Sequence, residues 1–340
     1  MHDGRKVLDV HGHVSAPLSL YTPALLMLAA NSPMPSAVKT GPMPPILPYD
    51  ISELEPAVEA HIRQLDKRRI DAQIIGPKPP MQFGWAPTHI IEACAELIND
   101  LIDAQCRLAP DRFLAAAQLP QRRDAEDSTH MLAELNRCVL ELGFVAAYVS
   151  PNPCGTRSLP GMHTRYWDPL YERAAHLDVP LIVHGAANRD ERSNDIFLGF
   201  QLDYQAEEYH AKQFVLRGRV FDRHPELRML ICHCGGVIER YPSADRAHMV
   251  ADDFVDNLFY DTCAYDAEFL SAAIRQLGPH RMCFGSEVPS AAGTTRDSTG
   301  RPSDDLVAKI DEFGWLDDSE KGAIFHENPL RFCKAFSSLT

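Results

Sequence analysis

Short apolar segments alternate with longer amphipathic ones along almost the whole 340-residue chain. The apolar segments end at turn residues and predict strands at 7–14, 72–76, 113–119, 144–150, 180–185, 228–234, 258–263 and 281–286. The segments between them have helical periodicity, at 53–69, 88–108, 125–142, 165–177, 206–223, 237–254, 267–277 and 304–313. The sequence therefore predicts eight consecutive strand–helix units.

Eight such units favour one closed parallel sheet. The predicted strands are nearly continuous apolar runs, which is typical of a parallel sheet covered by helices, and eight units predict a (β/α)8 TIM-type barrel. The alternative, an open doubly wound sheet, usually has a glycine-rich phosphate turn after its first strand, and HGHVSAP is not one. We expect residues 1–340 to form a single α/β domain with long βα loops. Among these, a proline-rich insertion at about 17–49 would be a lid or a subunit arm.

The charge balance argues against two classes of partner. The chain has 33 Lys and Arg against 47 Asp and Glu, a formal net charge of −14, whereas nucleic acids and anionic membranes demand basic surfaces. It also lacks an apolar stretch of membrane-spanning length and a signal-peptide-like N-terminus. The nine cysteines lack the spacing of a disulfide scaffold. We expect a cytoplasmic protein with reduced thiols and neither kind of partner.

Histidines occur where predicted strands end, which is where a barrel of this kind places its active site. His11 and His13 are two residues apart, so both side chains point into the barrel at a spacing that can chelate one metal ion. His184 closes the fifth strand and His233 the sixth. If His233 faces inward, its neighbours Cys232 and Cys234 face the helices and are structural.

The eighth strand delivers a carboxylate, Glu287, to the same end of the barrel. Any one of these residues alone could be an ordinary core histidine or a solvated glutamate. Four strands that each end in histidine or carboxylate favour a metal site made by His11, His13, His184 and Glu287. Such a donor set suits one divalent ion, Zn²⁺ or another first-row ion such as Mn²⁺.

At this point the motifs resemble a known group of enzymes. DVHGH, LIVHG, ICHCGG, FYDTC, FGSE and FHENPLRF occur in the order found in the amidohydrolase superfamily, in the branch that includes aminocarboxymuconate-semialdehyde decarboxylase. Most of that branch has aspartate in the eighth-strand motif, whereas this chain has GSEVP. Together with QIIGPKPP and AYVSPNPCG, this glutamate resembles the 4-oxalomesaconate hydratases.

The resemblance implies a metal-dependent lyase that hydrates a C=C bond in a small unsaturated keto polycarboxylate during aromatic-acid catabolism. One alternative is non-oxidative decarboxylation of an aromatic or enolic acid, for which the same ligands would serve. A second is amide or lactone hydrolysis, for which many relatives use a carboxylated lysine that the fourth strand lacks. A metal-binding barrel without activity is a third.

Roles for individual residues follow from this expectation. Glu287 would accept a proton from the attacking water and His233 would protonate or polarise the enolate. Asp261 would orient a ligand histidine, because metal-bound imidazoles generally need such a partner. The carboxylates of the substrate would be bound by Lys78, Tyr204 and Asn152, with lysine in place of the arginine of the hydratases. By analogy with relatives, we expect a homo-oligomer, a dimer or larger.

Overall fold

The computed structural model describes residues 2–17, 51–82, 84, 86–186, 204–239 and 255–340. The proline-rich insertion, the loop after the fifth strand and nearly all of the helix expected at 237–254 lie outside these residues. All nine cysteines are free thiols. In the described part of the chain, no helix is both long and apolar enough to cross a membrane.

Eight parallel strands follow one another around a barrel, in the order of the sequence. Backbone hydrogen bonds from Val10 N to Phe284 O (2.9 Å) and from Glu287 N to His11 O (2.7 Å) join the last strand to the first. The (β/α)8 fold is therefore confirmed. The strands are β1 Leu8–His13, β2 Ala72–Gly76, β3 Phe113–Gln118, β4 Ala146–Val149, β5 Leu181–Val183, β6 Met229–Ile231, β7 Leu258–Asp261 and β8 Met282–Cys283.

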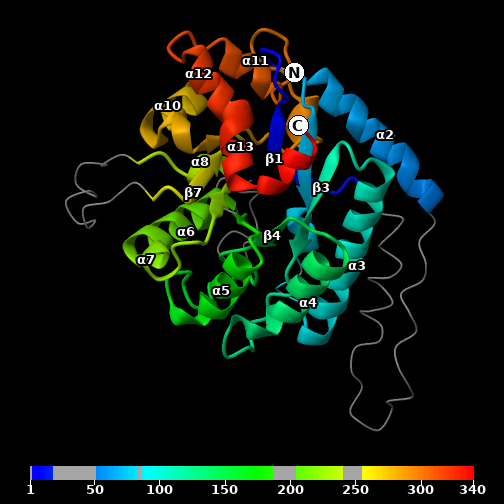
Figure 1. Cartoon of the computed structure of the whole chain (residues 1–340), viewed down its shortest axis with the longest axis vertical. Helices are drawn as coiled ribbons and strands as arrows, with labels where there is room; N and C mark the ends of the chain where they lie inside the picture. Colours follow the sequence, from blue (N-terminus) through cyan, green and yellow to red (C-terminus); the bar gives the residue numbers. More distant parts are fainter. Residues whose placement is uncertain (1, 18–50, 83, 85, 187–203, 240–254) are drawn as a thin grey trace, which may run out of the picture.

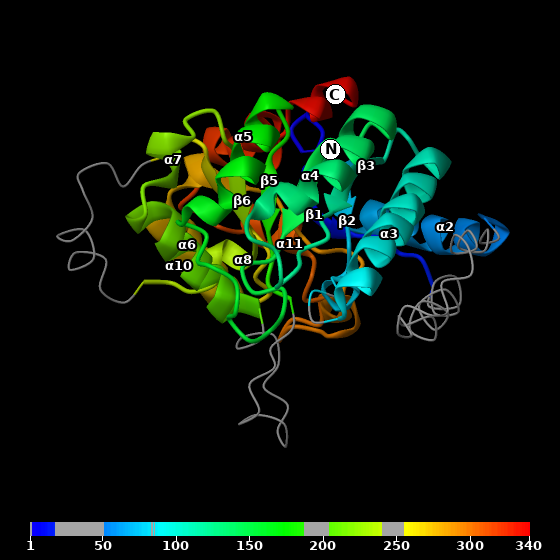
Figure 2. The same ribbon diagram turned by 90° about the horizontal axis from the view of Figure 1, so that it is seen from below.

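Helices surround the strands (Figure 1). Seen from below, α2 and α3 lie on one side of the strands and α6, α7 and α10 on the other (Figure 2). The helix predicted at 125–142 is broken into a 3-10 turn, α4 and a π-helical turn. The helices are α2 Ile51–Lys67, α3 Thr88–Leu108, α4 Leu132–Asn136, α5 Asp168–His176, α6 Ala206–Arg217, α7 Val220–Arg223, α8 Cys232–Gly235, α10 Ala267–Leu277, α11 Leu306–Asp311, α12 Asp318–Gly322 and α13 Asn328–Phe332.

The end of the chain closes the bottom of the barrel. Phe332 and Phe336 pack into the same cluster as the inward side chains of the strands. The Arg228 guanidinium, just before β6, donates to the Phe332 carbonyl oxygen at 2.7 Å. Because the C-terminal segment occupies this end, the opposite end, at the carboxyl termini of the strands, is where polar side chains can gather.

Candidate metal centre

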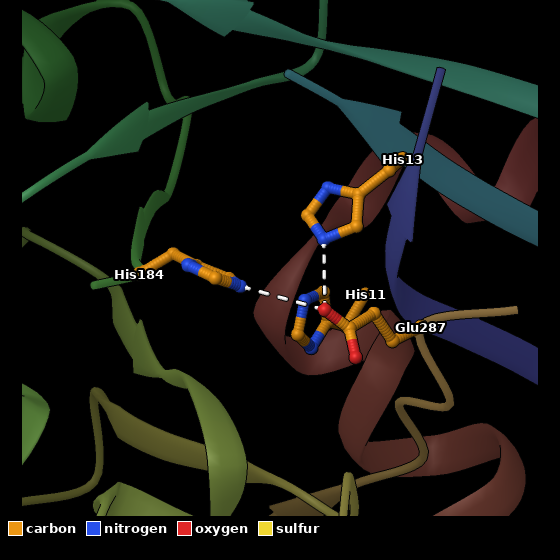
Figure 3. Close-up of side chains that lie close together, drawn as sticks. All are labelled: His11, His13, His184 and Glu287. Carbon is orange, nitrogen blue, oxygen red and sulfur yellow. Dashed lines mark hydrogen bonds and ion pairs between the residues drawn. The ribbon is translucent and has the colours of Figure 1, made fainter. Parts of the chain in front are cut away.

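Four side chains converge at the carboxyl ends of the strands. His11 and His13 come from β1, His184 follows β5 and Glu287 follows β8 (Figure 3). One ligand atom from each lies within 4.8 Å of those of the other three. Glu287 Oε1 is 3.2 Å from His13 Nε2 and 3.9 Å from His184 Nε2. The structure thus brings together the four residues predicted as metal ligands.

A bulge in β1 explains how both of its histidines face inward. The register between β1 and β2 shifts between Asp9 and Gly12, and Val10 lies in the interior cluster directly before His11. A regular strand would place Val10 and His11 on opposite faces. The bulge instead turns consecutive side chains into the barrel, while Asp9 points outward to accept a hydrogen bond from Gln73 at 2.8 Å.

His11 and His184 each have a ring nitrogen suited to a cation. His11 Nδ1 is 2.6 Å from Asp261 Oδ2, and His184 Nδ1 is 2.6 Å from the Gly185 carbonyl oxygen. With Nδ1 as the donor, Nε2 carries the lone pair. The Nε2 atoms of His11 and His184 are buried and have no hydrogen-bond partner in the described structure. Such orphaned acceptors, set around a carboxylate, fit a divalent metal ion.

Burial keeps His11 and His13 neutral. It lowers the pKa of His11, although Asp261 opposes the shift, and it lowers the pKa of His13 to about 3 despite the nearby Glu287. Neutral imidazole is the form that binds metals. The electrostatics of this cluster therefore favour the binding of a metal cation by His11 and His13 over protonation of their rings.

Glu287 is held in an unusual backbone conformation. Its φ is +60°, a region that non-glycine residues seldom adopt, and active sites often contain such residues. A Cβ atom on Gly285, two residues earlier, would lie 2.7 Å from Asp261 Cβ and 3.0 Å from His11 Cβ, so only glycine permits this approach. Burial would raise the pKa of the Glu287 carboxyl. The nearby His13 and His184 rings and the charge of His233 outweigh it and hold the pKa of this carboxyl well below its usual range.

Asp9 ties the two ligand-bearing strands together. It accepts hydrogen bonds from His11 N at 3.0 Å and from Ser286 N at 3.1 Å, and also from the Ser286 hydroxyl. Burial, only partly opposed by these bonds, raises the pKa of Asp9 to about 7. Asp9 thus fixes the backbone next to His11 and next to Glu287.

His233 lies beside the cluster, but not on a strand as predicted. β6 ends at Ile231, and His233 and Cys234 have φ of 50° and 57°. This left-handed turn brings the His233 ring centroid to 4.9 Å from that of His184 and 5.3 Å from that of His11. The prediction that Cys232 faces the helices is wrong: Cys232 packs in the barrel interior, and only Cys234 packs in the outer core.

Glu208 on α6 determines the charge of His233. Both of its carboxylate oxygens are 2.9 Å from His233 Nδ1, and both side chains are buried. Burial would lower the pKa of His233, but the charge and hydrogen bonds of Glu208 outweigh it and raise the pKa to about 10. Glu208 therefore favours the imidazolium form of His233, whereas burial favours the neutral form of His11 and His13.

The predicted substrate-binding residues are in different settings. The Lys78 side chain is half-buried and has no ion-pair or hydrogen-bond partner in the described structure, and burial lowers its pKa. Tyr204 lies with its ring centroid 5.8 Å from that of His184. Asn152 is buried, and its amide oxygen accepts a hydrogen bond from Arg157 N at 2.8 Å. This bond orders the loop and leaves the amide nitrogen as a donor.

Sequence reasoning missed three residues that touch the site. Glu208 lies in a helical stretch, Asp9 precedes the histidine motif, and Tyr265 follows β7, with its hydroxyl donating to Glu287 Oε2 at 2.7 Å. Only Asp9 carried a signal, as a charged residue in an otherwise apolar strand. The contacts of Glu208 and Tyr265 depend on how loops distant in sequence pack.

Comparisons of sequence and structure find several related proteins. A family model described as Amidohydrolase matches residues 8–333. A 2-keto-4-carboxy-3-hexenedioate hydratase of Sphingobium sp. is 29% identical over 338 residues, covering 96% of this chain and 95% of that protein. A gamma-resorcylate decarboxylase of Rhodococcus jostii is 26% identical over 257 residues, covering 68% of this chain and 77% of that protein. A solved structure of 4-oxalomesaconate hydratase from Rhodopseudomonas palustris matches with a TM-score of 0.81 at 25% identity, covering 98% of this chain and 97% of that one.

Proposed function

This chain belongs to the amidohydrolase family, and from that premise we propose that it is a metal-dependent hydro-lyase. Its substrate would be a small unsaturated keto polycarboxylate from the breakdown of aromatic acids, and the reaction would add water across a C=C bond. The observation that carries this proposal is the placement of an ionised carboxylate, Glu287, and a protonated imidazole, His233, on the same cluster of donors. The end-to-end similarity to two hydratases supports it.

The ion would be held by His11, His13, His184 and Glu287, with Zn²⁺ the ion proposed and Mn²⁺ the alternative. When bound, a divalent ion supplies Lewis acidity and a water of lowered pKa. The His11 ring would be kept in register by Asp261 through its Nδ1 hydrogen bond. The chain itself contributes the proton transfers.

Hydration needs one base and one acid. Glu287, with its pKa held low, is ionised at neutral pH and would accept a proton from the water whose oxygen bonds to the β-carbon. The electron pair of the C=C bond moves toward the carbonyl, which gives an enolate. His233 would then deliver a proton from Nε2 to the α-carbon, because Glu208 occupies Nδ1. One water is consumed, and the cycle would close when Glu287 releases its proton and His233 takes one up again, through solvent.

An anionic substrate fits the setting of Lys78. Its ammonium group is half-buried and has no counter-ion among the described residues, so a substrate carboxylate would offset the cost of its burial. Tyr204, beside the His184 ring, and the Asn152 amide nitrogen would add hydrogen bonds. Homo-oligomerisation and a cytoplasmic location remain predictions.

Decarboxylation is the second candidate, favoured by the similarity to a gamma-resorcylate decarboxylase. In that reaction His233 would protonate the carbon that loses CO₂, and no attacking water would be needed. Glu287 would then have no proton to accept from water. The two reactions thus differ in what they require of Glu287.

The test uses zinc-loaded protein and a panel of unsaturated keto polycarboxylates and hydroxylated aromatic acids. We expect loss of the ultraviolet absorbance of a conjugated substrate without release of CO₂. Glu287→Gln should abolish turnover and leave the metal content largely intact, because the amide oxygen can still act as a ligand but cannot accept the proton. Release of CO₂, or unchanged turnover by Glu287→Gln, would overturn the hydratase proposal.

A further inference from the structure

Glu287 has two carboxylate oxygens, and the site treats them differently. Oε1 faces His13 Nε2 at 3.2 Å and His184 Nε2 at 3.9 Å. Oε2 accepts a hydrogen bond of 2.7 Å from the Tyr265 hydroxyl. A glutamate side chain has one more rotatable bond than an aspartate, so its carboxylate needs an additional contact to stay in one orientation.

Tyr265 is itself firmly held. Its backbone carbonyl accepts a hydrogen bond from Lys309 Nζ at 2.7 Å, and Lys309, a buried lysine on α11, also binds the Ser303 carbonyl at 2.8 Å. The Tyr265 hydroxyl lies 3.5 Å from Cys263 Sγ. A tyrosine hydroxyl is ordinarily protonated at neutral pH, so it can donate to the Glu287 carboxylate. A neutral, anchored donor of this kind can hold the carboxylate without competing for a cation.

We propose that Tyr265 is a positioning residue for Glu287. By donating a hydrogen bond to Oε2, it keeps Oε1 turned toward the three imidazoles. The part of the proposal that concerns turnover rests on the proposed function, in which Glu287 is the base. The part that concerns metal affinity does not. Tyr265 is the contact that lets a glutamate act where most of the resembling branch has an aspartate.

A double-mutant cycle separates this role from a merely structural one. The variants are Tyr265→Phe, Glu287→Asp and the two combined, and the readout is the zinc dissociation constant from competition with a chelator. Partners of metal ligands typically contribute 10–100-fold to metal affinity or activity. We expect Tyr265→Phe to weaken zinc binding about 10-fold. In the Glu287→Asp background the same change should have less than about a 2-fold effect, because the shorter carboxylate is withdrawn from the hydroxyl.

A matched control removes a buried tyrosine hydrogen bond elsewhere. The Tyr171 hydroxyl on α5 donates to the Met162 carbonyl oxygen at 2.8 Å, and Tyr171→Phe should lower the unfolding temperature but leave zinc affinity unchanged. If Tyr265→Phe binds zinc as tightly as wild type, or loses the same factor in both backgrounds, the proposal is wrong. These outcomes are independent of the substrate, so they stand even if the protein proves to be a decarboxylase.

Turnover supplies a second readout once a substrate is found. Tyr265→Phe at saturating zinc should lower kcat about 10-fold or more with little change in KM, because a misoriented carboxylate still allows the substrate to bind. An equal rise in KM with unchanged kcat would instead place Tyr265 in substrate binding and contradict the positioning role.

Discussion

The two sides of the barrel mouth use the same residue type in opposite charge states. On the β1 side, burial keeps His11 and His13 neutral. On the β6 side, 5.3 Å away between ring centroids, Glu208 keeps His233 protonated. The difference shows that burial alone does not decide the charge of a histidine here. All three rings are buried, and the carboxylate of Glu208 overcomes the effect of burial on the pKa of His233. His11 and His13 on the β1 side therefore offer lone pairs that can bind a cation, whereas His233 on the β6 side carries a proton.

Asp261 and Glu208 sharpen this contrast. Both are buried carboxylates that bind the Nδ1 of a site histidine, at 2.6 Å and 2.9 Å. Asp261 shares its charge with backbone donors, since Oδ1 accepts from Cys234 N and Cys263 N. Among the described residues, Glu208 accepts from the backbone at Gly185 N alone, while both of its oxygens face His233. We infer that Glu208 keeps His233 charged because both of its oxygens face that ring. Asp261 leaves His11 neutral because it also accepts hydrogen bonds from the backbone.

The largest effect is expected from removing a metal ligand on the β1 side of the mouth. His13→Ala removes one of three imidazole ligands, so zinc affinity should fall by more than the roughly 100-fold upper range for a partner of a ligand, and activity should disappear with it. Metal analysis after dialysis measures the loss. The exposed helix histidine in His176→Ala is the matched control and should retain zinc. Full zinc content in His13→Ala would remove His13 from the metal site.

Removing the charge that keeps His233 protonated should leave metal binding unchanged. Glu208→Gln keeps the shape and an acceptor oxygen but removes the charge that raises the pKa of His233. Loss of a positioned acid costs about 10²–10⁴-fold in rate, so we expect kcat at neutral pH to fall about 100-fold with unchanged zinc content. Glu207→Gln, on the same helix but paired with Arg157, is the control. Parallel loss of zinc in Glu208→Gln would show that the two sides are not separate.

The sequence was sufficient to predict the metal ligands, but not the surroundings of His233. All eight strands could be predicted because apolar runs between turn residues reflect burial in the sheet, and strand ends located His11, His13, His184 and Glu287. The orientation of Cys232 could not be predicted, because the left-handed turn at His233 interrupts the alternation on which the prediction depended. Glu208 was missed because it approaches His233 from α6, 25 residues earlier in the chain.

The smallest effect concerns the stability of the metal-free protein. His233 has a pKa of about 10 when folded and an ordinary value of 6.5, so the folded state binds its proton more tightly. The stabilisation from this proton is complete below about pH 6.5 and is lost as the pH rises through about 10. Over that window the unfolding free energy of wild type should fall relative to that of His233→Gln by up to about 1.4 kcal/mol per pH unit, the slope for one proton.

Urea unfolding of the two metal-free proteins between pH 6 and 10 measures this slope. Taking the difference between them cancels the titration of the many tyrosines, lysines and cysteines that they share. A flat difference between wild type and His233→Gln would mean that Glu208 does not hold a proton on His233. In that case both sides of the mouth would carry neutral imidazoles, and the acid of the reaction would have to come from elsewhere.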